Sequence, residues 1–175
     1  MSNSKSCYDL IGHAQAALVM QRMGVPKSAV NCMFMMLQEA IHKVRTGYGD
    51  STTSYGGKSN STPMHGICQG KGAGLAVWAV LSSPLLEIQR KKGFGLYLFT
   101  PLSKTEIKFL GYAFVDDSDL VQTLLQEGNR IDLVSLMQQS ITSWEGSLSA
   151  TSSALVPKKT FWYLVYFVWH AGSLR

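Results

Sequence analysis

Two adjacent aspartates interrupt the most strand-like stretch of this 175-residue chain. From Leu110 to Phe114, larger and smaller side chains alternate, and a period of two is typical of a β-strand with one buried face. Asp116 and Asp117 then break the run as a turn would, and residues 118–122 can return as the partner strand. The pattern therefore predicts an antiparallel hairpin interrupted by two carboxylates.

Other segments show the apolar spacing of helices or the composition of strands and loops. The predicted helices are residues 9–23, a stretch from Pro26 to Val44, a stretch from Leu75 to Arg90, and residues 124–148 with a stripe of Leu125, Ile131, Val134, Met137 and Ile141. Further strands are predicted at 94–100, 106–110 and 161–169, and a hairpin or loop at 46–63. This element order predicts an α+β fold, in which helices cover one face of an antiparallel sheet.

Composition narrows the classes of protein to which the chain can belong. Hydrophobic residues make up 46% of it, which excludes a disordered chain, and the length fits one domain. The net charge of +5 is compatible with a polyanionic partner without requiring one. The three cysteines form no CxxC pair, so we expect reduced thiols in an intracellular protein. Because no apolar run approaches the roughly 20 residues of a membrane span, no membrane partner is expected.

The aspartate pair admits two interpretations. Asp is a favoured turn residue, so Asp116 and Asp117 can simply form a polar turn. Alternatively, they bind hard divalent cations, which prefer carboxylate oxygens. Two Mg²⁺ ions roughly 3.5–4 Å apart can stabilise the attacking and leaving oxygens of a phosphoryl transfer, and a carboxylate on a neighbouring strand usually completes such a site.

Four short motifs resemble those of reverse transcriptases and occur in the same order. They are Cys7-Tyr8-Asp9 (the end of an Asp-x-x-x-Cys-aromatic-Asp box), Gly66-Ile67-Cys68-Gln69-Gly70 (Gly-x-x-Gln-Gly), Phe114-Val115-Asp116-Asp117 (aromatic-x-Asp-Asp), and Gly146 with Lys158-Lys159-Thr160. Together they cover the whole chain and are similar to the motifs of non-LTR retrotransposons. The resemblance implies the palm domain of an RNA-directed DNA polymerase, with a ferredoxin-like core.

The resemblance also implies roles for individual residues. Asp116 and Asp117 would be catalytic ligands of Mg²⁺ or Mn²⁺, and Lys159 would give a proton to the pyrophosphate leaving group. The implied partners are an RNA or DNA template with its primer, and deoxynucleoside triphosphates.

Three further residues would bind the substrates according to the same resemblance. Tyr8 matches the aromatic residue that lies against the incoming sugar and excludes a 2′-hydroxyl. Gln69 and Gly70 would lie along the template and the nucleotide, where glycine permits a close backbone approach.

The chain departs from the family at its first motif. Asn3 stands where the resemblance places a third metal-binding Asp. Asn is neutral and a much poorer Mg²⁺ ligand, so we expect weak or no polymerase activity. Residues 1–175 also leave no room for the fingers and thumb domains, so we expect a palm fragment of a longer polyprotein.

Three other functions stay open. The chain could be a non-catalytic nucleic-acid-binding remnant or a domesticated protein derived from a reverse transcriptase, which its basic charge would suit. It could be another palm enzyme such as a nucleotidyl cyclase, although the Gly-x-x-Gln-Gly box argues against that. It could also be a translated relic without function.

Overall fold

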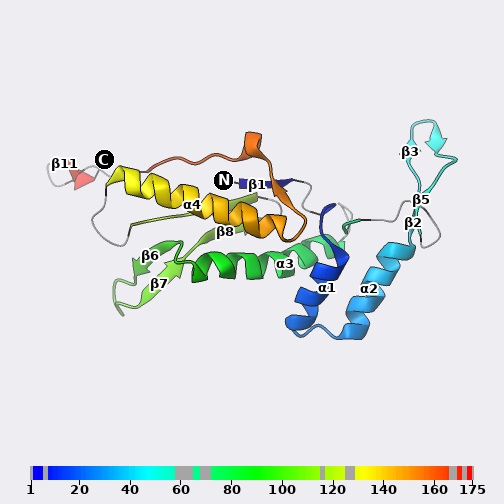
Figure 1. Ribbon diagram of the computed structural model, residues 1–175, viewed down its shortest axis with the longest axis horizontal. Helices are drawn as coiled ribbons and strands as arrows, with labels where there is room; N and C mark the ends of the chain where they lie inside the picture. Colours follow the sequence, from blue (N-terminus) through cyan, green and yellow to red (C-terminus); the bar gives the residue numbers. More distant parts are fainter. Residues whose placement is uncertain are drawn as a thin grey trace.

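The computed structural model shows an α+β fold in which four strands form an antiparallel sheet (Figure 1). It describes residues 2–5, 8–57, 65–67, 72–114, 117–124, 129–165, 169–170 and 173–174. The sheet contains β1 (Ser2–Lys5), β8 (Gly111–Phe114), β9 (Asp117–Leu120) and β10 (Ala154–Leu155), in the order β10-β1-β9-β8. Each neighbouring pair is antiparallel, and β8 and β9 are the two arms of the predicted hairpin. The predictions of an α+β fold and of this hairpin are therefore confirmed.

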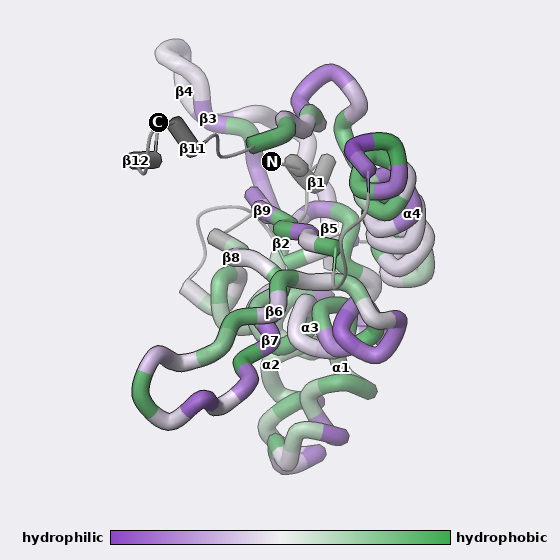
Figure 2. Tube along the Cα trace, turned by 90° about the vertical axis from the view of Figure 1, so that its left-hand side faces the viewer, coloured by the Kyte–Doolittle hydropathy of each residue, from purple (hydrophilic) through white to green (hydrophobic). Residues whose placement is uncertain are grey.

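Four helices in the described part of the chain match the four that the apolar spacing predicts. They are α1 (His13–Arg22), α2 (Lys27–Glu39), α3 (Gly72–Lys91) and α4 (Arg130–Ser149). The helix α3 packs against α1 on one side and α4 on the other. Figure 2 shows α3 and α4 on one side of the main sheet.

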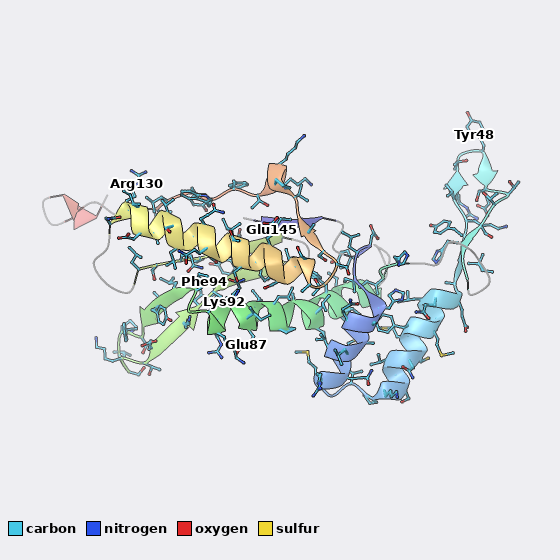
Figure 3. The ribbon with its side chains drawn as sticks, viewed as in Figure 1. Tyr48, Glu87, Lys92, Phe94, Arg130 and Glu145 are labelled. Carbon is cyan, nitrogen blue, oxygen red and sulfur yellow. The ribbon has the colours of Figure 1, made fainter. Side chains whose placement is uncertain are left out.

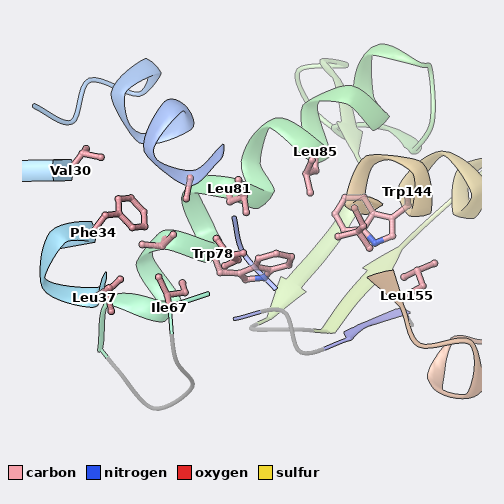
Figure 4. Packing of buried hydrophobic residues seen from close by; sticks show 13 residues of the cluster. Val30, Phe34, Leu37, Ile67, Trp78, Leu81, Leu85, Trp144 and Leu155 are labelled. Carbon is pink, nitrogen blue, oxygen red and sulfur yellow. The ribbon is translucent and has the colours of Figure 1, made fainter. Parts of the chain in front are cut away.

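The hydrophobic core lies where these helices meet the sheet. Its buried apolar residues are Ile11, Ala16, Val30, Phe34, Leu37, Ile67, Val77, Trp78, Leu81, Leu85, Trp144, Leu148 and Leu155 (Figure 4). Ile67 is completely buried in this cluster, although it lies in a loop. The core therefore includes the start of the glycine-rich motif, and anchors that motif to the helices.

Short hairpins lie outside the main sheet. One is formed by β6 (Leu96–Phe99) and β7 (Glu106–Phe109), as the strand predictions at 94–100 and 106–110 indicate. In another, β2 (Ile41–His42) pairs with β5 (Tyr55–Gly56), while β3 (Arg45–Thr46) pairs with β4 (Gly49–Asp50) at its tip. This second hairpin extends away from the helices (Figure 1) and confirms the hairpin prediction over its described residues. The strands β11 (Trp169–His170) and β12 (Ser173–Leu174) also pair.

The second helix is shorter than predicted. It ends at Glu39, and Ala40 takes an extended conformation with a ψ of 132°. Ile41 then pairs with Gly56 in β2, and both Ile41 and Val44 are largely exposed instead of lying on the helix face. β-Branched residues fit a strand better than a helix, which explains why the pairing takes over here.

The predicted aromatic strand at residues 161–169 is wrong over its described part. Residues 161–165 form no strand, and Phe161, Trp162 and Tyr163 are 54%, 41% and 72% exposed. The last strand of the main sheet is the two-residue β10, which is followed after Val156 by a 3₁₀ turn that begins at Pro157 (η1, Pro157–Lys159). Proline has no amide hydrogen for a sheet bond, so the pairing stops before the aromatic residues.

The buried face of α4 is rotated from the predicted stripe. Its buried residues are Ser140, Trp144, Ser147 and Leu148, while Ile131 is 76% exposed. Val134, Met137 and Ile141 line a cavity of about 470 Å³ between α4, β9 and residues 160–165. Leu125 lies outside the described residues.

One described helix, α3, is long and apolar enough to cross a membrane by length and composition. Its residues Val77, Trp78, Leu81 and Leu85 are buried in the core, between α1 and α4. The apolar composition of α3 follows from this central position, because a helix that packs on two sides needs apolar residues around most of its surface.

Candidate functional site

The sheet brings Asn3 and Asp117 together although they are far apart in the sequence. In the register of β1 against β9, Asn3 lies directly opposite Asp117, and Ser2 lies opposite Ser118. Asp117 also pairs with Phe114 across the hairpin, so it belongs to β9 itself. Its side chain is half-buried. Two of the three positions predicted to bind a metal are therefore neighbours on adjacent strands, while Asp116 lies outside the described residues.

The chemistry of these residues suits a hard cation only in part. Aspartate and asparagine both offer oxygen ligands, which Mg²⁺ and Mn²⁺ prefer. Asp116, Asp117 and Asn3 together would carry two negative charges instead of the three that an all-aspartate set would carry. Among the side chains that the structure describes, no group of three His, Cys, Asp or Glu residues could hold a metal ion. These three residues are thus the kind of oxygen ligand that Mg²⁺ and Mn²⁺ prefer, but they carry one negative charge fewer than three aspartates would.

The first two motifs meet through their backbones. The amide of Ile67 donates a hydrogen bond of 2.8 Å to the carbonyl of Tyr8. Gly66 has a φ of +73°, and a Cβ there would collide with the Tyr8 carbonyl oxygen and lie 2.5 Å from the carbonyl carbon of Asp9. Only glycine fits this conformation and this contact without strain. The start of the Gly-x-x-Gln-Gly segment is therefore fixed on the residues that follow β1.

Tyr8, predicted to face the sugar of a nucleotide, has a half-buried side chain that packs against the hydrophobic core. Its hydroxyl oxygen is buried. Gln69 and Gly70, the other predicted substrate-binding residues, lie outside the described residues.

His13, the first residue of α1, makes the side-chain contact to this segment. Its Nε2 lies 2.6 Å from the carbonyl oxygen of Gly66, and its Nδ1 lies 3.2 Å from the Nε2 of Gln38 on α2. Its ring also lies 5.0 Å from that of the buried Phe34, centroid to centroid. Sequence analysis missed this residue, because its only signal is a polar side chain at the start of an apolar helix, which gives no hint of a partner 53 positions away.

Lys159, predicted to be the proton donor, is exposed on η1. The preceding strand β10 runs antiparallel to β1, with Leu155 opposite Ser4. After β10 the chain therefore leaves the sheet near the N-terminal end of β1. The contact of Lys159 with a leaving group stays a prediction.

The basic end of α3 is tied to the protein itself. Arg90 donates two hydrogen bonds of 2.6 Å to Glu87, and this guanidinium lowers the pKa of the Glu87 carboxyl. Lys92 donates to Ser143 on α4 at 2.8 Å, and Lys108 donates to the backbone carbonyl of Arg90 at 3.0 Å. Lys92 and Lys108 thus link the end of α3 to α4 and to β7, while the Arg90 pair lies within α3.

A second pair of this kind stabilises the distant hairpin. Arg45 donates to both carboxylate oxygens of Asp50, at 2.7 and 3.2 Å, which lowers the pKa of the Asp50 carboxyl. The same contact raises the pKa of Arg45. Both groups are exposed, so water and salt weaken the pair, as they do at most protein surfaces.

No protein-family model, curated protein or solved structure matches this chain. A functional argument for it consequently depends on the residues and their geometry alone.

Proposed function

We propose that the chain is the palm portion of a retroelement RNA-directed DNA polymerase, with a nucleotidyl-transfer site that Asn3 weakens. The observation that carries this proposal is the register that sets Asn3 opposite Asp117. These positions are 114 residues apart, since 117 − 3 = 114, and the motif resemblance requires them to be neighbours. Helix and strand patterns alone, without the motifs, would rarely place these two positions opposite each other.

The strand order supports the same proposal. Taken in chain order, the four sheet strands are separated by helices after the first and after the third, and their spatial order is fourth, first, third, second. This order is consistent with the ferredoxin-like arrangement, also called split βαβ, that we propose for the chain. It puts the first and third strands side by side, as a polymerase palm needs for its carboxylates.

Each residue of the proposed site would have its own role. Asp116 and Asp117, with the amide oxygen of Asn3, would hold a divalent cation, and a bound cation supplies charge stabilisation to the attacking and leaving oxygens. Tyr8 would lie against the sugar, Gln69 and Gly70 against the template and nucleotide, and Lys159 would hold the proton for the leaving group. We expect slow or undetectable synthesis by this chain, because one carboxylate of the set is replaced by a neutral amide.

The test restores the missing charge. Asn3→Asp should tighten Mn²⁺ binding by about tenfold or more, because affinity for hard cations rises with the number of charged ligands. Electron paramagnetic resonance measures that binding, and primer extension on an RNA template measures Mn²⁺-dependent nucleotide incorporation. Asn3→Ser is the matched control, since it changes the same side chain without adding charge.

Two results would contradict the proposal. Equal Mn²⁺ binding by Asn3→Asp and Asn3→Ser would mean that residue 3 does not face the cation. Robust synthesis by the unchanged chain would show that Asn3 does not weaken the site.

The exposed aromatic segment favours a second candidate, a nucleic-acid-binding remnant without catalysis. Phe161, Trp162 and Tyr163 are each more than 40% exposed, and exposed aromatic rings can stack on unpaired bases. This candidate predicts salt-dependent binding of single-stranded RNA that is lost on removing the rings and is unchanged by Asn3→Asp.

A further inference from the structure

His13 occupies a position between three segments that the motif resemblance does not connect. It is the first residue of α1, its ring contacts the Gly66 carbonyl in the glycine-rich segment, and it accepts a hydrogen bond from the side-chain amide of Gln38 on α2. The glycine-rich segment itself lies against Tyr8 through the amide of Ile67. A single side chain thus holds the segment from the side opposite to its backbone bond with Tyr8.

The hydrogen-bond partners define the state of the ring. A backbone carbonyl can only accept, so Nε2 of His13 must carry the hydrogen that it donates to Gly66. Nδ1 is then the acceptor, which suits the amide nitrogen of Gln38 at 3.2 Å. Gln38 therefore selects the tautomer that binds Gly66, as second partners commonly do for functional histidines.

The close backbone approach at Gly66 is what such a clamp maintains. The positive φ of Gly66 is one that glycine adopts without strain, and the absence of a Cβ lets the segment lie directly against the backbone of Tyr8 and Asp9. The bond from Ile67 to Tyr8 and the bond from His13 to Gly66 act on the two ends of one peptide unit, because the Gly66 carbonyl and the Ile67 amide belong to the same peptide group. Loss of either would free the segment to shift relative to Tyr8.

We propose that His13 is a positioning residue that sets the distance between Gly66–Ile67 and Tyr8, and thereby controls nucleotide affinity and discrimination between deoxyribose and ribose. The effect on nucleotides rests on the proposed polymerase function. The positioning of Gly66 and Ile67 rests only on the contacts above. Sugar discrimination depends on this positioning, because Tyr8 can exclude a 2′-hydroxyl only if the nucleotide is held against the Tyr8 ring from the other side.

The first measurement does not depend on any activity. His13→Phe keeps the ring beside Phe34 and removes both hydrogen bonds. We expect the Ile67 amide to exchange with solvent at least tenfold faster, while the amides of Ala150 and Thr151 at the end of α4 keep their rates. His13→Gln, which retains a donor and an acceptor, should restore part of the protection.

The matched control is His42→Phe, which makes the same substitution in the distant β2–β5 hairpin. His42 stacks on Tyr55 and has no contact with the glycine-rich segment among the described residues. Gln38→Leu is a milder variant that removes only the partner of Nδ1, and it keeps the test decisive if His13→Phe fails to fold. It should also accelerate exchange at Ile67.

The second measurement is nucleotide binding, with dATP and ATP in the presence of Mn²⁺. In His13→Phe we expect weaker dATP binding and a ratio of dATP to ATP affinity reduced by about tenfold, with partial rescue in His13→Gln. Unchanged exchange at Ile67 in both His13→Phe and Gln38→Leu would overturn the positioning role. Faster exchange with an unchanged affinity ratio would overturn the role in discrimination. If the unchanged chain binds neither nucleotide, the proposed polymerase function fails, and the exchange data alone decide the positioning role.

Discussion

At the scale of single residues, the backbone conformation of Gly66 is a strict requirement of the fold. Its φ of +73° and its contact with Tyr8 and Asp9 both exclude a Cβ. We therefore expect Gly66→Ala to lower the free energy of unfolding by about 2–4 kcal/mol, from a strained φ together with a steric clash. Urea denaturation of the purified chain measures this loss.

Gly24 provides a matched control for Gly66. It also has a positive φ, of +91°, but nothing lies within 4 Å of the position of its Cβ. Gly24→Ala should consequently cost about 1 kcal/mol, the conformational part alone. Equal losses in the two variants would show that Gly66 does not press against Tyr8.

At the scale of elements, Gln122 joins three parts of the fold after the end of β9. Its Oε1 accepts from the amide of Gly95, just before β6, and its Nε2 donates to the Oγ of Ser140 on α4, both at 2.9 Å. Gln122→Met keeps the length of the side chain but leaves two buried polar groups without their partner. We expect a loss of about 2–4 kcal/mol in unfolding free energy, measured by urea denaturation.

Gln138 is the corresponding control on the exposed face of α4. Its one described contact, with Thr142, is 3.5 Å long and exposed. Gln138→Met should change stability by no more than about 0.5 kcal/mol. If Gln122→Met were equally mild, the bridge would not hold β9 and α4 together.

At the scale of the whole molecule, the helices and the main sheet share a core, while the β2–β5 hairpin lies apart from it (Figures 1 and 3). Tyr48 at its tip is fully exposed, whereas Trp78 and Trp144 are buried. Because proteases need an accessible segment, chymotrypsin should cut after Tyr48 before it cuts after either tryptophan. Mass spectrometry of a limited digest identifies the order of cleavage.

A Tyr48→Ser variant controls for this digest. It should lose the early cut in the hairpin and leave the later fragments unchanged. Early cleavage at Trp78 would mean that α3 is not packed between α1 and α4.

Local patterns predicted the elements that depend on their own residues. The period of two before Asp116 identified the β8–β9 hairpin, and apolar spacing identified α1, α3 and α4. Such patterns succeed because one buried face imposes the same spacing wherever the element packs. The register that places residue 3 opposite Asp117 joins two strands, β1 and β9.

The contacts that complete the candidate site could not be predicted in this way. The two-residue strand β10 is too short for a periodic pattern, so the strand that borders β1 on the side away from β9 was not predicted. The face of α4 turned inward is set by Trp144 and Leu148, which fill the core, and not by its most regular apolar stripe. His13 finds its partner 53 residues away.

The sequence by itself determined the helices, the aspartate hairpin and the loss of charge at residue 3, because these depend on side-chain order along one segment. Only the tertiary structure decided which strand borders β1, where the aromatic rings lie, and that His13 holds Gly66 against Tyr8. The physical reason is that burial and hydrogen bonding are satisfied by whichever group the folded chain brings near, and distance along the sequence does not limit that choice.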